Sequence, residues 1–209
     1  MKLASDSFKD GGPSPAELAF CAPDAQTHVK VSANRNPGLA WSEFPAGTKS
    51  FAVICHDPDV PSVGTDVNQE GRTVSATLAR VDFFHWVLVD LPVHITRIAA
   101  GEFSSSVVAQ GQDGPATLHG ARHGINDYTG WFAADPAMAG DYYGYDGPCP
   151  PWNDEIAHRY VFTVFALDVA KFALQGRFDG PQARDAMKGH VLAQAVVTGK
   201  YALNPAVKF

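Results

Sequence analysis

The sequence lacks long apolar runs and an excess of positive charge, and each absence excludes a class of protein. Its formal net charge is -6, whereas a general nucleic-acid binder presents a basic surface to phosphates. No uninterrupted apolar run reaches the roughly 18 residues that a membrane-spanning helix needs. The first residues show no apolar core of the signal-peptide kind. We therefore expect no nucleic-acid partner, no membrane span and a cytoplasmic location.

Cysteine is also scarce, with only Cys21, Cys55 and Cys149. The number is odd and no pair has the spacing of a metal site, so we expect neither a disulfide framework nor a bound metal. Cys55 alternates with Val53 in an apolar stretch, which is typical of a buried core thiol. Cys149 lies between prolines, where we expect a loop and a thiol exposed enough to react.

The composition is that of an ordinary globular protein. The chain has 209 residues, of which 45% are hydrophobic and 18% charged, enough for one sizeable core. We find no internal repeat, linker or low-complexity segment, so we expect a single domain over residues 1–209.

Three stretches combine an apolar strand with a polar residue at one end. Residues 51–57 alternate apolar side chains and finish at Asp57, before a proline-rich turn. The second strand begins near His85. The third, residues 158–167, begins with His158 and Tyr160 on one face and is apolar on both, as expected of a central strand. If the first strand lies antiparallel between the other two, Asp57 meets both histidines.

Alternation and spacing also predict the flanking structure. His85, Val87 and Val89 should share one face of their strand. After Gly180-Pro181, apolar residues recur at helical spacing as far as Ala195, and residues 196–201 then form a final short strand.

Several ordered motifs resemble one protein family. They are Asp57-Pro58-Asp59-Val60-Pro61, then His85-Trp86-Val87, then Gly147-Pro148-Cys149-Pro150-Pro151 ahead of His158-Arg159-Tyr160. Together they resemble the phosphatidylethanolamine-binding proteins, and most closely their bacterial Raf-kinase-inhibitor-like branch. The resemblance extends from about residue 36 to residue 201. It implies an all-β, two-sheet sandwich with peripheral helices.

The resemblance also implies a pocket for phosphate-like or small carboxylate groups at Asp57, His85, His158 and Tyr160. An acid beside two histidines favours their protonated forms, and imidazolium, hydroxyl and loop amide groups would then donate to an oxyanion. Apolar walls would come from Pro61, Phe84 and Pro150, and the loop containing Gly147 and Pro148 would supply the amides. No cofactor is implied. Family members further suggest a kinase or protease as partner and a homodimer.

Two features depart from the family pattern or leave alternatives open. Residues 62–82 are a polar insertion, which we interpret as a surface loop near the pocket mouth. Zinc ligation by Asp57 and the histidines has no supporting motif, and no Gly-x-Ser-x-Gly elbow indicates a serine hydrolase. An acid–base hydrolase that uses Asp57 and His158 stays open as the alternative to binding.

Overall fold

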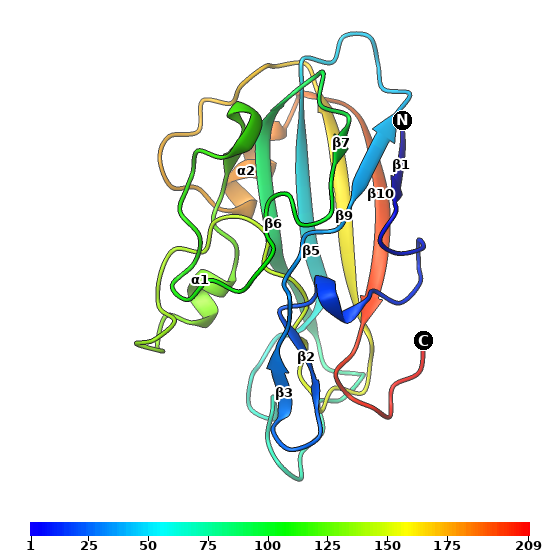
Figure 1. Cartoon of the computed structure of the whole chain (residues 1–209), viewed down its shortest axis with the longest axis vertical. Helices are drawn as coiled ribbons and strands as arrows, with labels where there is room; N and C mark the ends of the chain where they lie inside the picture. The colour runs from blue at the N-terminus through cyan, green and yellow to red at the C-terminus, as the bar shows by residue number, and fades with distance from the viewer.

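The computed structural model describes all residues 1–209 and is built mainly of antiparallel β-sheet (Figure 1). A five-stranded sheet has the order β10-β9-β5-β6-β8, a three-stranded sheet has the order β1-β4-β7, and β2 pairs with β3. The strands are β1 (Lys2–Ser5), β2 (Cys21–Asp24), β3 (His28–Val31), β4 (Leu39–Ser42), β5 (Ser50–Pro61), β6 (Arg80–Pro92), β7 (Arg97–Ile98), β8 (Arg122–His123), β9 (His158–Leu167) and β10 (Val191–Tyr201).

The helices are few and short. The α-helices are α1 (Tyr128–Trp131) and α2 (Gly180–Met187), and Ala16–Leu18 and Leu118–Gly120 form single 3-10 turns. None of them has the length and apolar character to cross a membrane.

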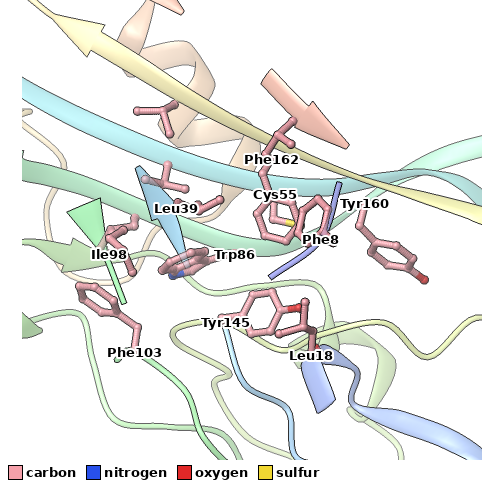
Figure 2. Packing of buried hydrophobic residues seen from close by; sticks show 14 of the residues in the cluster. Phe8, Leu18, Leu39, Cys55, Trp86, Ile98, Phe103, Tyr145, Tyr160 and Phe162 are labelled. Atoms are coloured by element: carbon pink, nitrogen blue, oxygen red, sulfur yellow. The ribbon is translucent and has the colours of Figure 1, made fainter. Parts of the chain in front are cut away.

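The central strands β5, β6 and β9 of the large sheet are covered on both faces, as the apolar strands predict, whereas the edge strand β10 is partly exposed. One face packs against the three-stranded sheet, where Leu39 and Ile98 join the larger buried cluster with Trp86 (Figure 2). The other face packs against α2, which contributes Ala183 and Met187 to a smaller cluster. The predicted all-β fold with two packed sheets and peripheral helices is thus confirmed, with the β2–β3 hairpin as an additional small sheet at one end (Figure 1).

The predicted position of the first strand is also confirmed. β5 is hydrogen-bonded to β6 on one side and to β9 on the other, antiparallel to both. The end of β5 therefore lies beside the starts of β6 and β9, where the polar residues gather.

β6 contains a β-bulge that the alternation pattern does not reveal. Cys55 pairs with Trp86 and the next residue, His56, pairs with Phe84, so His85 has no partner across the ladder. An extra residue of this kind bends the strand and re-aims the side chains around it.

The bulge reverses the expected faces of β6. Phe84 packs with Val87 and Val89 in the smaller cluster beside α2, whereas His85 lies with Phe83 on the opposite face. The prediction that His85 shares a face with Val87 and Val89 is therefore wrong, because it assumed an unbroken two-residue period.

The C-terminal helix is shorter than predicted. Asp179 caps α2 and exchanges side-chain and backbone hydrogen bonds with Gln182, a reciprocal arrangement that fixes the start. Gly189, at φ +81°, stops the helical path. β10 then begins at Val191, so residues predicted as helix as far as Ala195 are strand.

Cys21 and Cys149 form a disulfide that joins β2 to the proline loop. The prediction of no disulfide is wrong, because the pair is separated by 128 residues and only the fold brings their Cα atoms to 4.9 Å. Cys149 is accordingly no free thiol. Cys55 is free and buried, as predicted.

Candidate functional site

A cavity of about 330 Å³ opens where β5 ends and β6 and β9 begin. Of the residues predicted for the site, six line it: Asp57, Pro61, His85, Pro150, His158 and Tyr160. Three separate strands thus bring their polar residues to one place, and the proline loop adds Pro150.

The other three predicted residues do not line the cavity. Phe84 lies on the far face of the sheet under Arg184, whose guanidinium is 4.5 Å from the ring centroid, because the bulge turns it away. Phe83 takes its place in the wall. Gly147 donates its N–H to Asn34 Oδ1, and Pro148 accepts from two backbone amides through its carbonyl, so both hold the loop rather than face the cavity.

His158 is held by a carboxylate at each ring nitrogen. Its Nδ1–H donates to Asp57 Oδ2 at 2.6 Å, and its Nε2–H donates to Asp154 Oδ2 at 3.1 Å. Burial opposes the charged ring, but the two carboxylates prevail and raise its pKa to about 9. His158 is therefore an imidazolium whose two N–H groups are both used inside the protein. They are not available to a ligand, contrary to the sequence-based expectation.

The ion cluster has two further members that sequence reasoning missed. Asp154 accepts two hydrogen bonds from Arg80, at 2.6 and 3.0 Å. Burial works against the Asp154 carboxylate, but the bonds from His158 and Arg80 lower its pKa. Asp154 lies four residues before His158 in the sequence, and that spacing is the only signal that could have indicated it.

The hydrogen bonds of His158 also decide whether it could bind a metal ion. Both ring nitrogens of His158 are engaged with carboxylates, so neither offers a free lone pair. No group of three or more His, Cys, Asp or Glu side chains is arranged to hold a metal ion.

His85 has the opposite protonation state. Its Nδ1–H donates to the backbone carbonyl of Asp146 at 2.7 Å, and its Nε2 has no partner in the protein. Burial lowers the pKa of His85 to about 4, although the nearby charge of Asp57 acts in the other direction. The ring is neutral at pH ~7, with the lone pair on Nε2. The expectation that both histidines are charged is wrong for His85.

Tyr160 supplies the unused donor of the site. Its hydroxyl is buried and has no hydrogen-bond partner, and its ring packs edge-on against His85 at 5.1 Å. Figure 2 shows the hydroxyl directed away from the buried cluster. Burial raises the pKa of Tyr160 well above its ordinary value, and the charge of Asp57 and a weak polar contact with its side chain, longer than a normal hydrogen bond, act in the same direction. The group therefore stays an O–H donor.

The proline loop offers fewer amides than expected. Pro148, Pro150 and Pro151 have no N–H, and Gly147 uses its own for Asn34. Cys149 retains the one loop N–H without an acceptor.

The inserted loop between β5 and β6 forms part of the cavity wall, through Gly64, Val67 and Asn68. It is held by Asn153, whose amide donates to the carbonyls of Asp66, Gln69 and Arg72. The Asn153 oxygen accepts from the backbone of Asn68. The insertion is therefore tied to the segment just before His158.

The rest of the wall is apolar and rich in aromatic rings. It includes Phe20, Val60, Phe83, Tyr128, Trp131, Phe132 and the disulfide. Trp131 is 57% exposed, so this lining reaches the surface. A small polar base under an apolar wall suits a ligand with a compact polar head and an apolar remainder.

Comparison with known proteins agrees with this architecture. The sequence pattern of the family described as phosphatidylethanolamine-binding protein matches residues 4–202. The UPF0098 protein YbhB of Escherichia coli is 31% identical over 201 residues, which cover 96% of this chain and 99% of that protein.

Solved structures give the same result. The crystal structure of E. coli YbcL, described as a new member of the mammalian PEBP family, matches with a TM-score of 0.68 and 26% identity, over 96% of this chain and 97% of that one. CT736 of Chlamydia trachomatis matches with a TM-score of 0.61 and 26% identity, over 96% of this chain and 95% of that chain. Since the family pattern spans nearly the whole chain, the chain belongs to the phosphatidylethanolamine-binding protein family.

Proposed function

We propose that this chain binds a small phosphate-like or carboxylate group whose apolar remainder packs against the aromatic wall of the cavity. The observation that carries the proposal is the buried Tyr160 hydroxyl, which has no partner and lines the cavity. A buried polar group without a partner costs stability, and a ligand oxygen would satisfy it. The family's description as a binding protein supports the same reading.

The geometry favours binding over the acid–base hydrolase alternative. His158 has no free nitrogen with which to take or give a proton. His85 has a free Nε2, but a group with a pKa of about 4 is a weak base near neutral pH. Asp57 already accepts from His158 and from the backbone of Asp59.

Two further predictions rest on the family resemblance alone, namely regulation of a kinase or protease through the bound group and a homodimer. The single domain and its cytoplasmic location are proposed from the sequence pattern. The Cys21–Cys149 disulfide counts against the cytoplasm, because disulfides persist mainly in oxidising compartments.

Calorimetric titration with inorganic phosphate and with butyl phosphate tests the proposal. We expect both to bind, and butyl phosphate to bind more tightly because its chain contacts the aromatic wall. Tyr160→Phe should weaken both about tenfold, since one hydrogen bond to a charged group is lost. Tyr145→Phe is the matched control, because that buried hydroxyl donates to Leu18 outside the cavity. Absence of binding by the wild-type protein would contradict the proposal.

A further inference from the structure

The polar base of the cavity presents more acceptors than donors. Its free donors are the Tyr160 hydroxyl and the Cys149 N–H. Its acceptors are Nε2 of His85 and the remaining lone pairs of Asp57, whose oxygens each accept one bond already. A ligand that brings only acceptors would leave part of this base unsatisfied.

The tautomer of His85 follows from its one hydrogen bond. The Asp146 carbonyl can only accept, so the bonded Nδ1 carries the proton. Neutral His85 therefore offers a lone pair at Nε2, and a second proton there would make the ring an imidazolium.

The surroundings of His85 oppose that second proton. The ring is buried and packs against Phe83, Tyr128 and Tyr160. Burial has the largest effect and disfavours a charged ring, whereas the charge of Asp57 and the hydrogen bond to the Asp146 carbonyl favour one. The charge of His158 acts in the same direction as burial.

A further neighbour of His85, His56, also disfavours a charged ring. Its own pKa is lowered by burial, so it adds little charge near neutral pH. The Asp146 side chain is held by the amides of Asn34 and Asn126, and it acts on His85 through its backbone carbonyl.

No uncompensated cation faces the cavity base. The negative charges of Asp57 and Asp154 are matched by the positive charges of His158 and Arg80, which bond to them directly. A fully deprotonated dianion would therefore place oxygens against the His85 lone pair and the Asp57 carboxylate, and gain no net Coulombic attraction in return.

We infer that the cavity selects oxyacids that keep a proton, so that of the two proposed ligand classes it favours a phosphate monoester, bound as its monoanion, over a deprotonated carboxylate, and rejects the corresponding sulfate ester. The P–O–H group donates to Nε2 of His85, and another ligand oxygen accepts from Tyr160. The proton stays on the ligand oxygen and is shared with Nε2 through the hydrogen bond, so binding of the dianion from solution takes up one proton. This inference rests on the proposed function, since it names the form of the ligand that the same site accepts.

The test compares butyl phosphate with butyl sulfate, which share an apolar chain and a tetrahedral head. Calorimetric titrations are run at acid, neutral and mildly alkaline pH and at fixed ionic strength. Because the second pKa of a phosphomonoester is about 6, phosphate affinity should fall about tenfold for each pH unit well above that value. The sulfate ester, which has no proton to donate at these pH values, should bind at least tenfold more weakly at neutral pH.

Proton uptake gives a measurement that needs no variant. Repeating the neutral titration in two buffers of different ionisation enthalpy counts the protons bound with the ligand. We expect an uptake that approaches one proton with butyl phosphate where that ester is a dianion in solution.

The variant His85→Asn removes Nε2, and its amide can still donate to the Asp146 carbonyl. It should reduce the preference for phosphate over sulfate towards unity. The control is His123→Gln, because His123 is a buried neutral histidine outside the cavity whose Nε2 accepts from Trp86. This control should keep the preference.

The outcomes are distinguishable. Equal affinity for the two esters in the wild-type protein, or no proton uptake, would overturn the selectivity and leave the proposed function standing. Absence of binding by both esters at every pH would overturn both.

Discussion

The two histidines of the cavity form a natural comparison, because one side chain appears twice in one wall with opposite charge. His158 is pinned between two carboxylates, and its pKa is raised to about 9. His85 is buried and bonded only to a neutral carbonyl, which does not offset the effect of burial, so its pKa is lowered to about 4. Both are almost fully buried, so burial alone does not decide the charge. The partner at each ring nitrogen decides it.

Because they differ in charge and in hydrogen bonding, the two histidines have different roles. His158 and its partners form a closed ion cluster, in which every charge is matched and the hydrogen bonds are internal. His85 keeps one ring nitrogen free towards the cavity. The ion cluster around His158 therefore holds the strand ends together, and Nε2 of His85 is available to a ligand.

Asp154→Asn, which breaks the buried ion cluster around His158, should have the largest effect on the free energy of unfolding. The change leaves Arg80 unpaired and removes one of the two carboxylates on the imidazolium. Breaking a buried ion pair costs about 3–5 kcal/mol of unfolding free energy, which urea denaturation at neutral pH measures. Histidine NMR titration should show the pKa of His158 falling while that of His85 stays low.

Asp82→Asn is the control for that change. Asp82 pairs with Arg184 where both side chains are well exposed, so its loss should cost at most about 1 kcal/mol. An equal effect of the two variants would mean that burial of the Asp154 cluster does not matter to stability.

The second prediction asks whether the two histidine pKa values are set by their hydrogen-bond partners or by the disulfide in the cavity wall. The Cys21–Cys149 disulfide lies in the cavity wall but is not among the hydrogen-bond partners of either histidine. Cys21→Ser with Cys149→Ser should cost about 2–4 kcal/mol of unfolding free energy and leave both histidine pKa values in place. A shift of either pKa towards that of free histidine would show that the disulfide, and not the hydrogen-bond partners, maintains the contrast.

The third prediction concerns the sign of the pH dependence at His85. Its pKa is lower in the folded protein than in the unfolded chain, so the folded state loses stability relative to the unfolded one as pH falls from about 6.5 to about 4. The variant His85→Asn has no imidazole to protonate at this position, so it does not lose this stability as pH falls. The stability advantage of the wild-type protein over the variant should therefore shrink by up to about 3 kcal/mol across that range.

Denaturation of both proteins at several pH values measures the difference. The pKa of Asp146 is raised to about 7 by burial, and that of His123 is lowered to about 3, also by burial. Both titrate in each protein, so their contributions cancel in the comparison. A constant difference between the proteins over the whole range would mean that His85 is not held neutral by the fold.

Much of this site is predictable from the sequence because the relevant signals are local. Strand alternation places Phe51, Val53, Cys55 and Asp57 on one face, and β5 keeps that period as far as the cavity. The motif order then brings the strand ends together through a simple antiparallel arrangement.

The features that the sequence did not predict depend on contacts between distant segments. A single bulged residue, His85, exchanges the roles of Phe83 and Phe84 in the cavity wall. The Cys21–Cys149 bond closes a long loop whose ends only the fold brings together. The charges of the histidines also depend on such contacts, because Asp57 lies 101 residues from His158 and the Asp146 carbonyl lies 61 residues from His85. Asp154 is close to His158 in sequence but lies outside the predicted motifs.

Tyr160→Phe should have the smallest effect on the free energy of unfolding. It tests whether the free groups beside His85 recognise the ligand. The hydroxyl has no partner in the unliganded protein, so its removal breaks no hydrogen bond and relieves the burial of an unsatisfied polar atom. Unfolding free energy should therefore change by less than about 1 kcal/mol, whereas a buried tyrosine that donates a hydrogen bond loses about that much. Tyr201→Phe provides this comparison, because its hydroxyl donates to the Cys21 carbonyl at 2.9 Å.

The free energy of unfolding is measured by urea denaturation with and without saturating butyl phosphate. Ligand should stabilise the wild-type protein and Tyr201→Phe by similar amounts, and Tyr160→Phe by about 1.4 kcal/mol less at the same concentration, which corresponds to a tenfold loss of affinity. If Tyr160→Phe is as destabilised as Tyr201→Phe without ligand, its hydroxyl already has a partner in the free protein. The ligand would then have to be recognised by the other atoms of the cavity.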